Sequence, residues 1–402
     1  MLEHRKSSVV LDLLDKDNDP IRNEDVKIEL VNHEFLFGCN AFDVGMYFFA
    51  PDEKKSFFED RVNKWLDVFN FATVPFYWGQ FEPEEGKPMT EAILHGAGFL
   101  QDKGVKVKGH PLCWHTLCAD WLMKYDNKTI MEKQLKRIDR DVTDFKGVID
   151  MWDVINEVVI MPKFDKYDNA ITRICNEYGQ VGLVKAVFDR AYENNKDATL
   201  LLNDFNTSKA YEDLIERCLD AGCKISAIGI QSHQHQGYWG REKTLDVLER
   251  FSRFGLPIHF TENTILSGTP VADYIEDLND WQVDEWPSTP EYEEIQKNNM
   301  EEMYRILFDC PQVKAITNWD FADGAWLNAP SGFVRRDNSP KPSYEMLKNL
   351  IHNEWSTNET LKTDNEGSVK VDGFKGEYVI KYKGRSAKFV LDDKGGRKQI
   401  II

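Results

Sequence analysis

The stretch VIDMWDVINE, residues 148–157, is an apolar run that ends in an amide and a carboxylate. A short run of this kind is typical of a strand that is covered on both faces. A carboxylate at the end of such a strand gains nothing from burial, because an unpaired buried carboxylate is costly. Glu157 therefore marks the end of this strand as a candidate functional position.

Outward from this stretch, short apolar runs alternate with longer stretches of helical periodicity, such as 131–145 and 185–193. This alternation predicts a parallel sheet with crossover helices. Eight such units suit a closed (β/α)8 TIM barrel, and a doubly wound open sheet is the structural alternative. The expected strands lie near residues 35–38, 68–74, 105–114, 149–156, 199–203, 225–232, 257–262 and 313–319.

Polar and charged residues gather at the carboxyl ends of these expected strands. In a parallel barrel those ends form one rim, which is where the active sites of barrel enzymes lie. This coincidence favours the barrel over the open sheet. The residues concerned are His110, Asn156, Glu157, Asn203, Asp204, Gln231, Ser232, His233 and Glu262.

The two ends of the chain have a different pattern. Residues 8–13 and 26–30 alternate like antiparallel strands, and so do short segments between 369 and 391. We expect residues 1–35 and 357–402 to pack together as one small β-layer beside a catalytic barrel of residues 36–356. Because these segments contain few aromatic residues, a structural brace is favoured over a carbohydrate-binding module.

Composition narrows the possible partners. The 402 residues carry a net charge of −18, which argues against nucleic acid, whereas a neutral glycan is compatible with that charge. No apolar run is long enough to cross a bilayer. Seven scattered Cys do not resemble a disulfide framework. We expect a monomer without cofactor that is cytoplasmic as written, or secreted if a leader has been trimmed.

A second carboxylate, Glu262, ends the apolar run of residues 257–261. Retaining hydrolysis of a glycosidic bond needs two carboxyl groups about 5–5.5 Å apart. Taken singly, each of Glu157 and Glu262 is explained as well by a structural role, as a solvated strand end or half of an ion pair, as by a catalytic one. On the fourth and seventh expected strands they can face each other across one rim, which favours catalysis.

Four strand-end motifs resemble those of glycoside hydrolase family 10, the family of endo-β-1,4-xylanases. They are KGHPLCWH (108–115), WDVINE (152–157), GIQSH (229–233) and Thr261-Glu262. Further similar stretches are LNDFN (202–206), FKG (145–147), and the region from NWD (318–320) through Trp326 to KPSY (341–344). The resemblance covers roughly residues 35 to 350.

The resemblance implies a retaining β-glycoside hydrolase acting on a β-1,4-linked oligo- or polysaccharide, with endo-β-1,4-xylanase as the leading activity. Glu157 would be the general acid/base, Glu262 the nucleophile, and Asn156 the ligand of the sugar 2-hydroxyl. The other implied substrate-binding residues are His110 and Trp114 beside the cleavage point, Gln231 and His233 near the nucleophile, and Trp319 and Trp326 as floor and wall.

The chain departs from the family pattern at two places. On the second strand, Val74 stands where an Asn is expected, and Tyr77 takes the sugar-binding position of a Lys. After the nucleophile, Asn263-Thr264 replaces the usual Leu-Asp, so either Thr264 or His235 is the expected partner of His233. Another β-glycan, or an aryl or terpenoid β-glycoside, therefore remains an alternative substrate.

Two other function classes compete with the glycosidase. In a metal-dependent TIM-barrel hydrolase the ligands would come from His110, His115, His233, His235 and Cys113, but Glu157 and Glu262 would then have no role. A non-catalytic glycan-binding protein on a decayed barrel is the third class. Retention of both glutamates argues against it.

Overall fold

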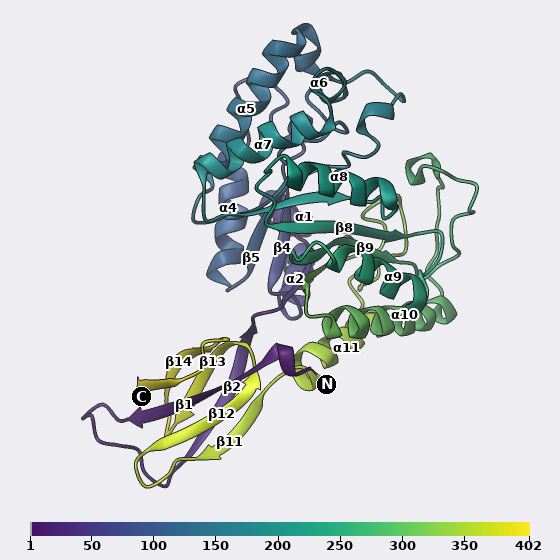
Figure 1. The fold of residues 1–402 in the computed structure, drawn as a ribbon. Helices are drawn as coiled ribbons and strands as arrows, with labels where there is room; N and C mark the ends of the chain where they lie inside the picture. The colour runs from purple at the N-terminus through teal and green to yellow at the C-terminus, as the bar shows by residue number, and fades with distance from the viewer. Residues whose placement is uncertain (1) are drawn as a thin grey trace. The chain divides into compact units, whose positions relative to one another are not determined.

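The computed structural model describes residues 2–402, which divide into two compact units. One unit comprises residues 37–343. The other combines the segments before residue 37 and after residue 343. Figure 1 shows the path of the chain through both units. No helix among residues 2–402 has the length and apolar character needed to span a membrane.

The larger unit is a closed barrel of eight parallel strands in the order β10-β3-β4-β5-β6-β7-β8-β9. The predicted (β/α)8 barrel is therefore confirmed, and the open sheet is excluded because the strands close on themselves. The strands are β3 (Leu36–Asn40), β4 (Phe71–Pro75), β5 (Lys106–His110), β6 (Met151–Asn156), β7 (Thr199–Asp204), β8 (Ala227–Gln234), β9 (Ile258–Ile265) and β10 (Val313–Asn318).

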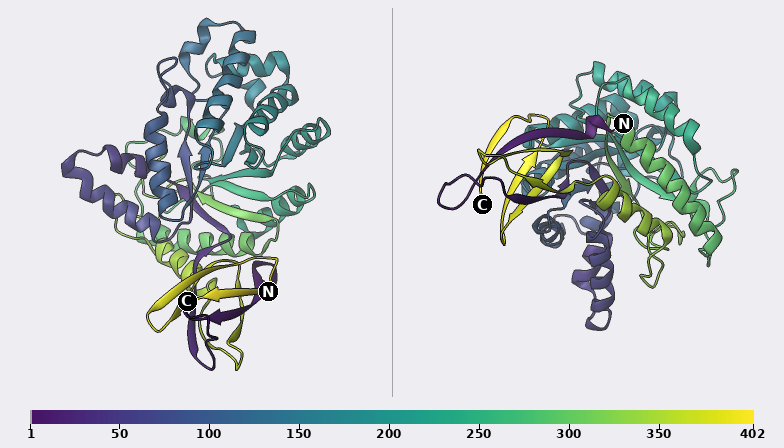
Figure 2. Two further views of the ribbon diagram at one scale, coloured as in Figure 1. Left: turned by 90° about the vertical axis from the view of Figure 1, so that its left-hand side faces the viewer. Right: turned by 90° about the horizontal axis from the view of Figure 1, so that it is seen from below.

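The helices are numbered in chain order, and those from α1 to α10 surround the barrel (Figures 1 and 2). They are α1 (Phe42–Phe49), α2 (Asp52–Leu66), α3 (Trp78–Phe81), α4 (Thr90–Asp102), α5 (Asn127–Asp144), α6 (Ala170–Tyr178), α7 (Gln180–Asn194), α8 (Lys209–Asp220), α9 (Gly240–Ser252), α10 (Pro290–Asp309) and α11 (Pro342–Asn349). Short 3-10 turns are η1 (Glu3–Arg5), η2 (Asp120–Lys124), η3 (Met161–Lys163) and η4 (Leu278–Asp280), and η5 (Leu350–Glu354) is a π-turn.

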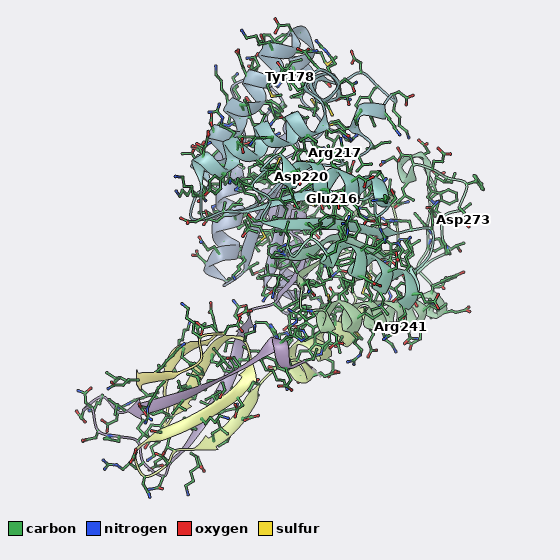
Figure 3. All side chains as sticks on the ribbon, viewed as in Figure 1. Tyr178, Glu216, Arg217, Asp220, Arg241 and Asp273 are labelled. Atoms are coloured by element: carbon green, nitrogen blue, oxygen red, sulfur yellow. The ribbon has the colours of Figure 1, made fainter. Side chains whose placement is uncertain are left out.

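Local capping chemistry sets where several helices begin. The side chain of Asp126 accepts a hydrogen bond from the backbone N–H of Thr129, which places the start of α5 before the predicted residue 131. At α10, Thr289 caps the first turn, and Pro290 follows at a position that needs no backbone donor. In Figure 3, Arg241 lies in the first turn of α9 and Asp273 on the long loop between β9 and α10.

Most strands differ from the predicted bounds by one to three residues at an end, and the differences at β5 and β9 bear on the rim. β5 ends at His110 rather than at 114, because Pro111 has no N–H to continue the ladder. β9 runs on to Ile265, where it still pairs with Gln234 of β8. Asn263 and Thr264 are consequently strand residues that are buried at the rim, rather than loop residues beyond it.

The β5–β6 pair is close-packed around the buried ring of Trp152. A Cβ atom built on Gly109 would lie 2.2 Å from the Trp152 ring, so only glycine fits between β5 and β6 at this point. Phe76 packs on the same ring at a centroid distance of 4.8 Å. This packing sets the spacing of the strands that carry His110 and Glu157.

The smaller unit contains two sheets that share one core. β1 (Lys6–Leu14) lies between β12 (Ser368–Phe374) and β15 (Arg397–Ile401), and the second sheet has the order β11 (Asn358–Lys362), β2 (Asp25–His33), β13 (Gly376–Tyr382) and β14 (Arg385–Leu391). The predicted association of the two chain ends is confirmed. The segments form two facing sheets rather than the single expected layer. Each sheet has one apolar face, and the two apolar faces bury each other around Leu11, Ile28 and Tyr378.

Candidate active site

Glu157 and Glu262 both lie at the carboxyl-end rim of the barrel, as predicted. Glu157 directly follows β6 and has a positive φ of 58°, an uncommon conformation for a residue with a side chain. Its backbone N–H donates to the carbonyl oxygen of Asn203 at 2.9 Å, which holds this conformation. Glu262 lies within β9 opposite Gln231, where the β8–β9 register shifts by a bulge.

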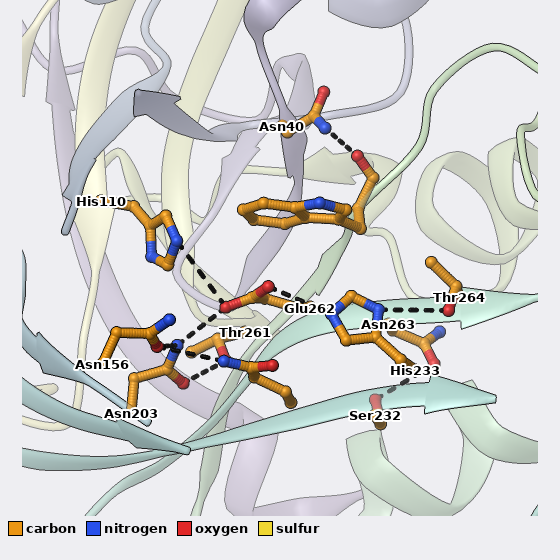
Figure 4. A network of polar contacts seen from close by, with 12 residues as sticks. Asn40, His110, Asn156, Asn203, Ser232, His233, Thr261, Glu262, Asn263 and Thr264 are labelled. Atoms are coloured by element: carbon orange, nitrogen blue, oxygen red, sulfur yellow. Dashed lines mark hydrogen bonds and ion pairs between the residues drawn. The ribbon is translucent and has the colours of Figure 1, made fainter. Parts of the chain in front are cut away.

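Three side-chain amides connect the two carboxylates (Figure 4 labels Asn156, Asn203 and Glu262). The amide nitrogen of Asn203 donates to Asn156 Oδ1 and to Glu262 Oε1, both at 2.8 Å. Gln231 donates to Asn156 Oδ1 at 3.0 Å and to Glu157 Oε1 at 3.1 Å. Asn156 Nδ2 also donates to Glu157 Oε1 at 3.2 Å. The predicted residues Asn156 and Gln231 are thus in direct contact with the catalytic candidates.

Asn203 has a bridging role that its position at a strand end did not indicate. Its amide is held in one orientation because Thr261 Oγ1 donates to Asn203 Oδ1 at 2.5 Å. A Cβ atom on Gly229 would lie 2.4 Å from the same oxygen, so the glycine makes room for the amide. The Gly in GIQSH and the Thr before Glu262 therefore both serve to place Asn203.

The carboxyl group of Glu157 is kept in its protonated form at neutral pH. Burial raises the pKa of Glu157 to about 8, and the negative charge of Glu262 adds to this effect. The indole N–H of Trp114 donates to Glu157 Oε2 at 2.8 Å, which partly opposes the rise. An acid with this pKa can deliver a proton near neutral pH.

Glu262 shows the opposite behaviour. Burial by itself would raise its pKa, but the electrostatic interaction with His110 and a hydrogen bond from His233 outweigh burial and lower the pKa below the ordinary 4.5. His233 Nε2 lies 3.1 Å from Glu262 Oε2, and His110 Nε2 lies 3.9 Å from Oε1. One rim thus holds one neutral acid and one carboxylate, which is the division of roles that glycosidases use.

The orientation of His110 comes from a buried ion pair beneath it. Asp153 Oδ2 lies 2.7 Å from His110 Nδ1 and 2.6 Å from the ammonium nitrogen of Lys108. All three side chains are buried. Because the Asp153 carboxylate accepts a hydrogen bond from Nδ1, the other ring nitrogen of His110 faces Glu262.

The partner of His233 is the hydroxyl of Thr264, at 3.3 Å from His233 Nδ1. The same hydroxyl lies 3.2 Å from His235 Nδ1, so both histidines share Thr264. Both expected partners of His233 therefore belong to one cluster (Figure 4 labels His233 and Thr264). Since a hydroxyl carries no charge, it orients the His233 ring without adding a negative charge beside Glu262.

Aromatic rings line the rim on both sides of Glu262. The ring of Tyr77 lies 5.6 Å from that of Trp114 and 5.7 Å from that of His110. The ring centroid of Trp319 lies 5.2 Å from that of His110. On the other side, the ring centroid of Trp326 lies 4.5 Å from that of His233. The predicted substrate-binding rings therefore surround the carboxylate pair.

Phe42, at the start of α1, is an additional ring that the sequence did not indicate. It contacts Tyr77 and Trp319 at centroid distances of 6.1 and 5.7 Å. Val74 is buried in β4 and supplies no hydrogen-bonding side chain. Burial, together with the negative charges of Glu262 and Glu157, holds the pKa of Tyr77 well above 10, so its hydroxyl is a neutral donor.

The proposed metal ligands are scattered rather than convergent. Across residues 2–402, no group of three or more His, Cys, Asp or Glu side chains is placed to hold a metal ion. His115 packs on Phe164 at 4.5 Å, His235 bonds to Thr264, and Cys113 is buried. This arrangement favours carboxylate chemistry over the metal-dependent alternative.

Comparison with curated proteins gives two kinds of relative. The anti-sigma-I factor RsgI6 of Acetivibrio thermocellus is 26% identical in an alignment of length 385 that covers 94% of this chain and 45% of that protein. Endo-1,4-beta-xylanase B of Thermotoga neapolitana is 26% identical over 294 residues, 68% of this chain and 78% of that protein. An endo-1,4-beta-xylanase/feruloyl esterase of Xylanibacter ruminicola is 25% identical over 70% of this chain and 40% of that protein. The chain spans less than half the length of the first and third of these relatives.

Solved structures show the same fold. Xylanase 10B of Thermotoga maritima superposes with a TM-score of 0.64 at 22% identity, covering 80% of this chain and 96% of that one. Xylanase 10B of Thermotoga petrophila RKU-1, solved with xylobiose, superposes with a TM-score of 0.64 at 21% identity, covering 80% of this chain and 95% of that one. The model of the family described as "Glycosyl hydrolase family 10" matches residues 75–350, more than half of the sequence. With its barrel and this match, the chain belongs to glycosyl hydrolase family 10.

Proposed function

We propose that this protein hydrolyses a β-glycosidic bond by double displacement with net retention of configuration. The observation that carries the proposal is the chain of amide hydrogen bonds that joins Glu157 to Glu262 on one barrel rim, and the opposed pKa shifts of the two groups agree with it. A protonated carboxyl can deliver a proton to the departing oxygen, and a carboxylate can attack the anomeric carbon. Membership of the family supports the same assignment.

In the first step, Glu262 forms a bond to the anomeric carbon while Glu157 gives its proton to the leaving oxygen. Formation of the glycosyl ester removes the negative charge of Glu262, which lowers the pKa of Glu157 and prepares it to act as a base. In the second step, Glu157 takes a proton from water, the water oxygen attacks the anomeric carbon, and Glu262 is released. Asn156 binds the sugar 2-hydroxyl in both steps.

The proposed substrate is a β-1,4-linked oligo- or polysaccharide, with xylan as the leading candidate. Aromatic rings such as Trp319 and Trp326 can stack on the apolar faces of sugars. The xylanases among the relatives, and the xylobiose bound to the Thermotoga petrophila enzyme, support a xylo-oligosaccharide. Because Val74 and Tyr77 offer few donors, another β-glycan or an aryl or terpenoid glycoside is the alternative substrate.

The test compares Glu157→Ala and Glu262→Ala on two substrates, a nitrophenyl β-xyloside and an unactivated xylo-oligosaccharide. Glu262→Ala should lose turnover of both. Glu157→Ala should retain turnover of the nitrophenyl substrate, because a good leaving group needs no protonation. The exposed residue Glu59 supplies the control variant, Glu59→Ala. Full activity of both site variants would contradict the proposal.

Glycan binding without turnover is the second candidate function. One observation supports it: the relative whose match extends over 94% of this chain is named as an anti-sigma factor and not as a hydrolase, whereas the match to the Thermotoga neapolitana xylanase extends over 68%. Calorimetric binding of xylo- and cello-oligosaccharides to the wild-type protein, with product analysis of the same samples, separates the two candidates. Binding with no product formed would establish the second.

A further inference from the structure

Two long loops and two short ones lie between β6 and α10. The loop after β6, residues 157–169, contains η3, and the loop after β9, residues 266–289, contains η4. The loops after the two strands between them, β7 and β8, are only residues 205–208 and 235–239. The two long loops therefore extend from the strands that carry Glu157 and Glu262.

The loop 157–169 lies beside Glu157. Its Phe164 packs edge-on against His115 at 4.5 Å and against Tyr167 at 4.9 Å. His115 in turn lies 6.2 Å from Trp114, whose indole N–H binds Glu157. This loop is thus held against the acid side of the site.

The loop 266–289 lies beside Glu262 and passes over the end of β8. The ring centroid of its Trp286 lies 5.9 Å from that of His235. The side chain of Gln236, just after β8, donates to the carbonyl oxygens of Ala272 at 3.2 Å and Ile275 at 2.8 Å. Ala272 and Ile275 are therefore placed beside the end of β8, shortly before Asp277 in the chain.

Lys166 joins these two loops. Its ammonium nitrogen lies 2.6 Å from Asp277 Oδ2 and 2.8 Å from Asp280 Oδ1. Asp277 is held in place because it also accepts the backbone N–H of Asn279 at 2.8 Å. We refer to Lys166, Asp277 and Asp280 as the loop clasp. It connects the Glu157 side of the rim with the Glu262 side.

The barrel order decides what the loop clasp does. A sugar that touches Glu157 and Glu262 lies between the ends of β6 and β9, and a chain continuing from it must leave over β7 and β8 or over the opposite strands. We propose that the loop clasp closes the β7–β8 side, so that short β-linked oligosaccharides and free chain ends reach the site whereas the interior of a polymer cannot enter sideways. This inference rests on the proposed function. It restricts the proposed substrates to short oligosaccharides and free chain ends.

The loop clasp is held by weak ion pairs, so salt or a single substitution should break it. The three side chains are partly exposed, Lys166 at 40%, Asp277 at 32% and Asp280 at 63%, and ion pairs between such groups are weak and screened by salt. Breaking it should raise the ratio of turnover on soluble β-1,4-xylan to turnover on a nitrophenyl β-xylobioside by about threefold to fivefold, given the weakness of such pairs. High salt should produce the same rise in the wild-type protein but none in a variant without Lys166.

The experiment measures this ratio at low and high salt for wild type, Lys166→Ala, and the charge exchange Lys166→Asp with Asp277→Lys and Asp280→Lys. The control is Lys185→Ala, which breaks a 2.7 Å pair of similar exposure with Asp189 on α7. Lys166→Ala should raise the ratio and remove its salt dependence. The charge exchange should bring back the wild-type ratio and its dependence on salt. An unchanged ratio in Lys166→Ala, with turnover intact, would overturn the inference.

A second measurement does not depend on turnover. Amide hydrogen exchange of residues 266–289 should become faster in Lys166→Ala, and should stay unchanged in Lys185→Ala, because the loop clasp holds this loop. If the wild-type protein cleaves no β-glycoside but this acceleration is seen, the proposed function fails and the loop clasp stands as a closure over a binding site. If exchange is unchanged, the loop clasp fails irrespective of activity.

Discussion

Replacement of Glu157 by Gln should make the stability of the protein less dependent on pH. The folded protein holds the pKa of Glu157 at about 8, whereas the ordinary value is 4.5. Between these pH values the unfolded chain has released the proton and the folded chain retains it. The folded state therefore binds more protons, and the free energy of unfolding falls as pH rises from about 4.5 to about 8.

The magnitude follows from the gap between the two pKa values. Each pKa unit corresponds to about 1.4 kcal/mol, so the full gap would amount to about 5 kcal/mol. Because Glu157 keeps partial contact with solvent, we take roughly half, about 2–3 kcal/mol lost between pH 5 and pH 8. The Glu157→Gln variant would have no proton to release at this position and should not show this loss.

Urea unfolding at pH 5, 6, 7 and 8 measures the difference. Glu157→Gln carries a separate cost that is independent of pH, because its amide nitrogen would face the indole N–H of Trp114. The informative quantity is therefore the change in the wild-type-minus-variant difference across the pH series. Glu59→Gln on the exposed face of α2 is the control. Parallel wild-type and Glu157→Gln curves from pH 5 to 8 would refute the account of Glu157 as a buried acid.

Three further outcomes are expected. A plot of log(kcat/KM) against pH should fall below the lowered pKa of Glu262 and above about pH 8, where Glu157 loses its proton, and a profile still rising past pH 9 would count against these roles. Thr264→Val should lower kcat/KM about fivefold to tenfold by removing the hydroxyl shared by two histidines, as steady-state kinetics beside the control Thr244→Val on α9 would show. Tyr77→Phe should raise KM for xylo-oligosaccharides about threefold with kcat nearly unchanged, and equal KM values would show that the hydroxyl does not touch substrate.

Much of the barrel can be predicted from sequence because most strands are short, largely apolar runs that end in polar residues. Residues 148–157 show why, since burial on both faces leaves no amphipathic signal to be misassigned. The extension of β9 through Asn263 and Thr264 could not be predicted, because these polar residues resemble a loop. They are buried because Asn263 accepts from Ser232 and Gln234, at 3.2 and 3.1 Å, on the neighbouring strand.

The carboxylate pair and its aromatic surroundings could be predicted because their positions follow from strand ends and from family motifs. Phe42 escaped prediction because it begins a helix rather than ending a strand. The bridging role of Asn203 depends on amide orientation, which no sequence pattern records. The pairing of Lys166 with Asp277 could not be predicted for another reason. Charged loop residues have no periodicity, and their pairing depends on how two loops fold toward each other.

The anomeric configuration of the first product tests the central account most directly. Proton NMR of a xylo-oligosaccharide digest, followed from the first minutes of the reaction, distinguishes the two anomers before they interconvert. If Glu262 attacks the sugar and Glu157 then activates water, the β-anomer should form first and the α-anomer should appear only by later mutarotation. Initial formation of the α-anomer would mean a single displacement by water, and would contradict the assignment of Glu262 as the nucleophile.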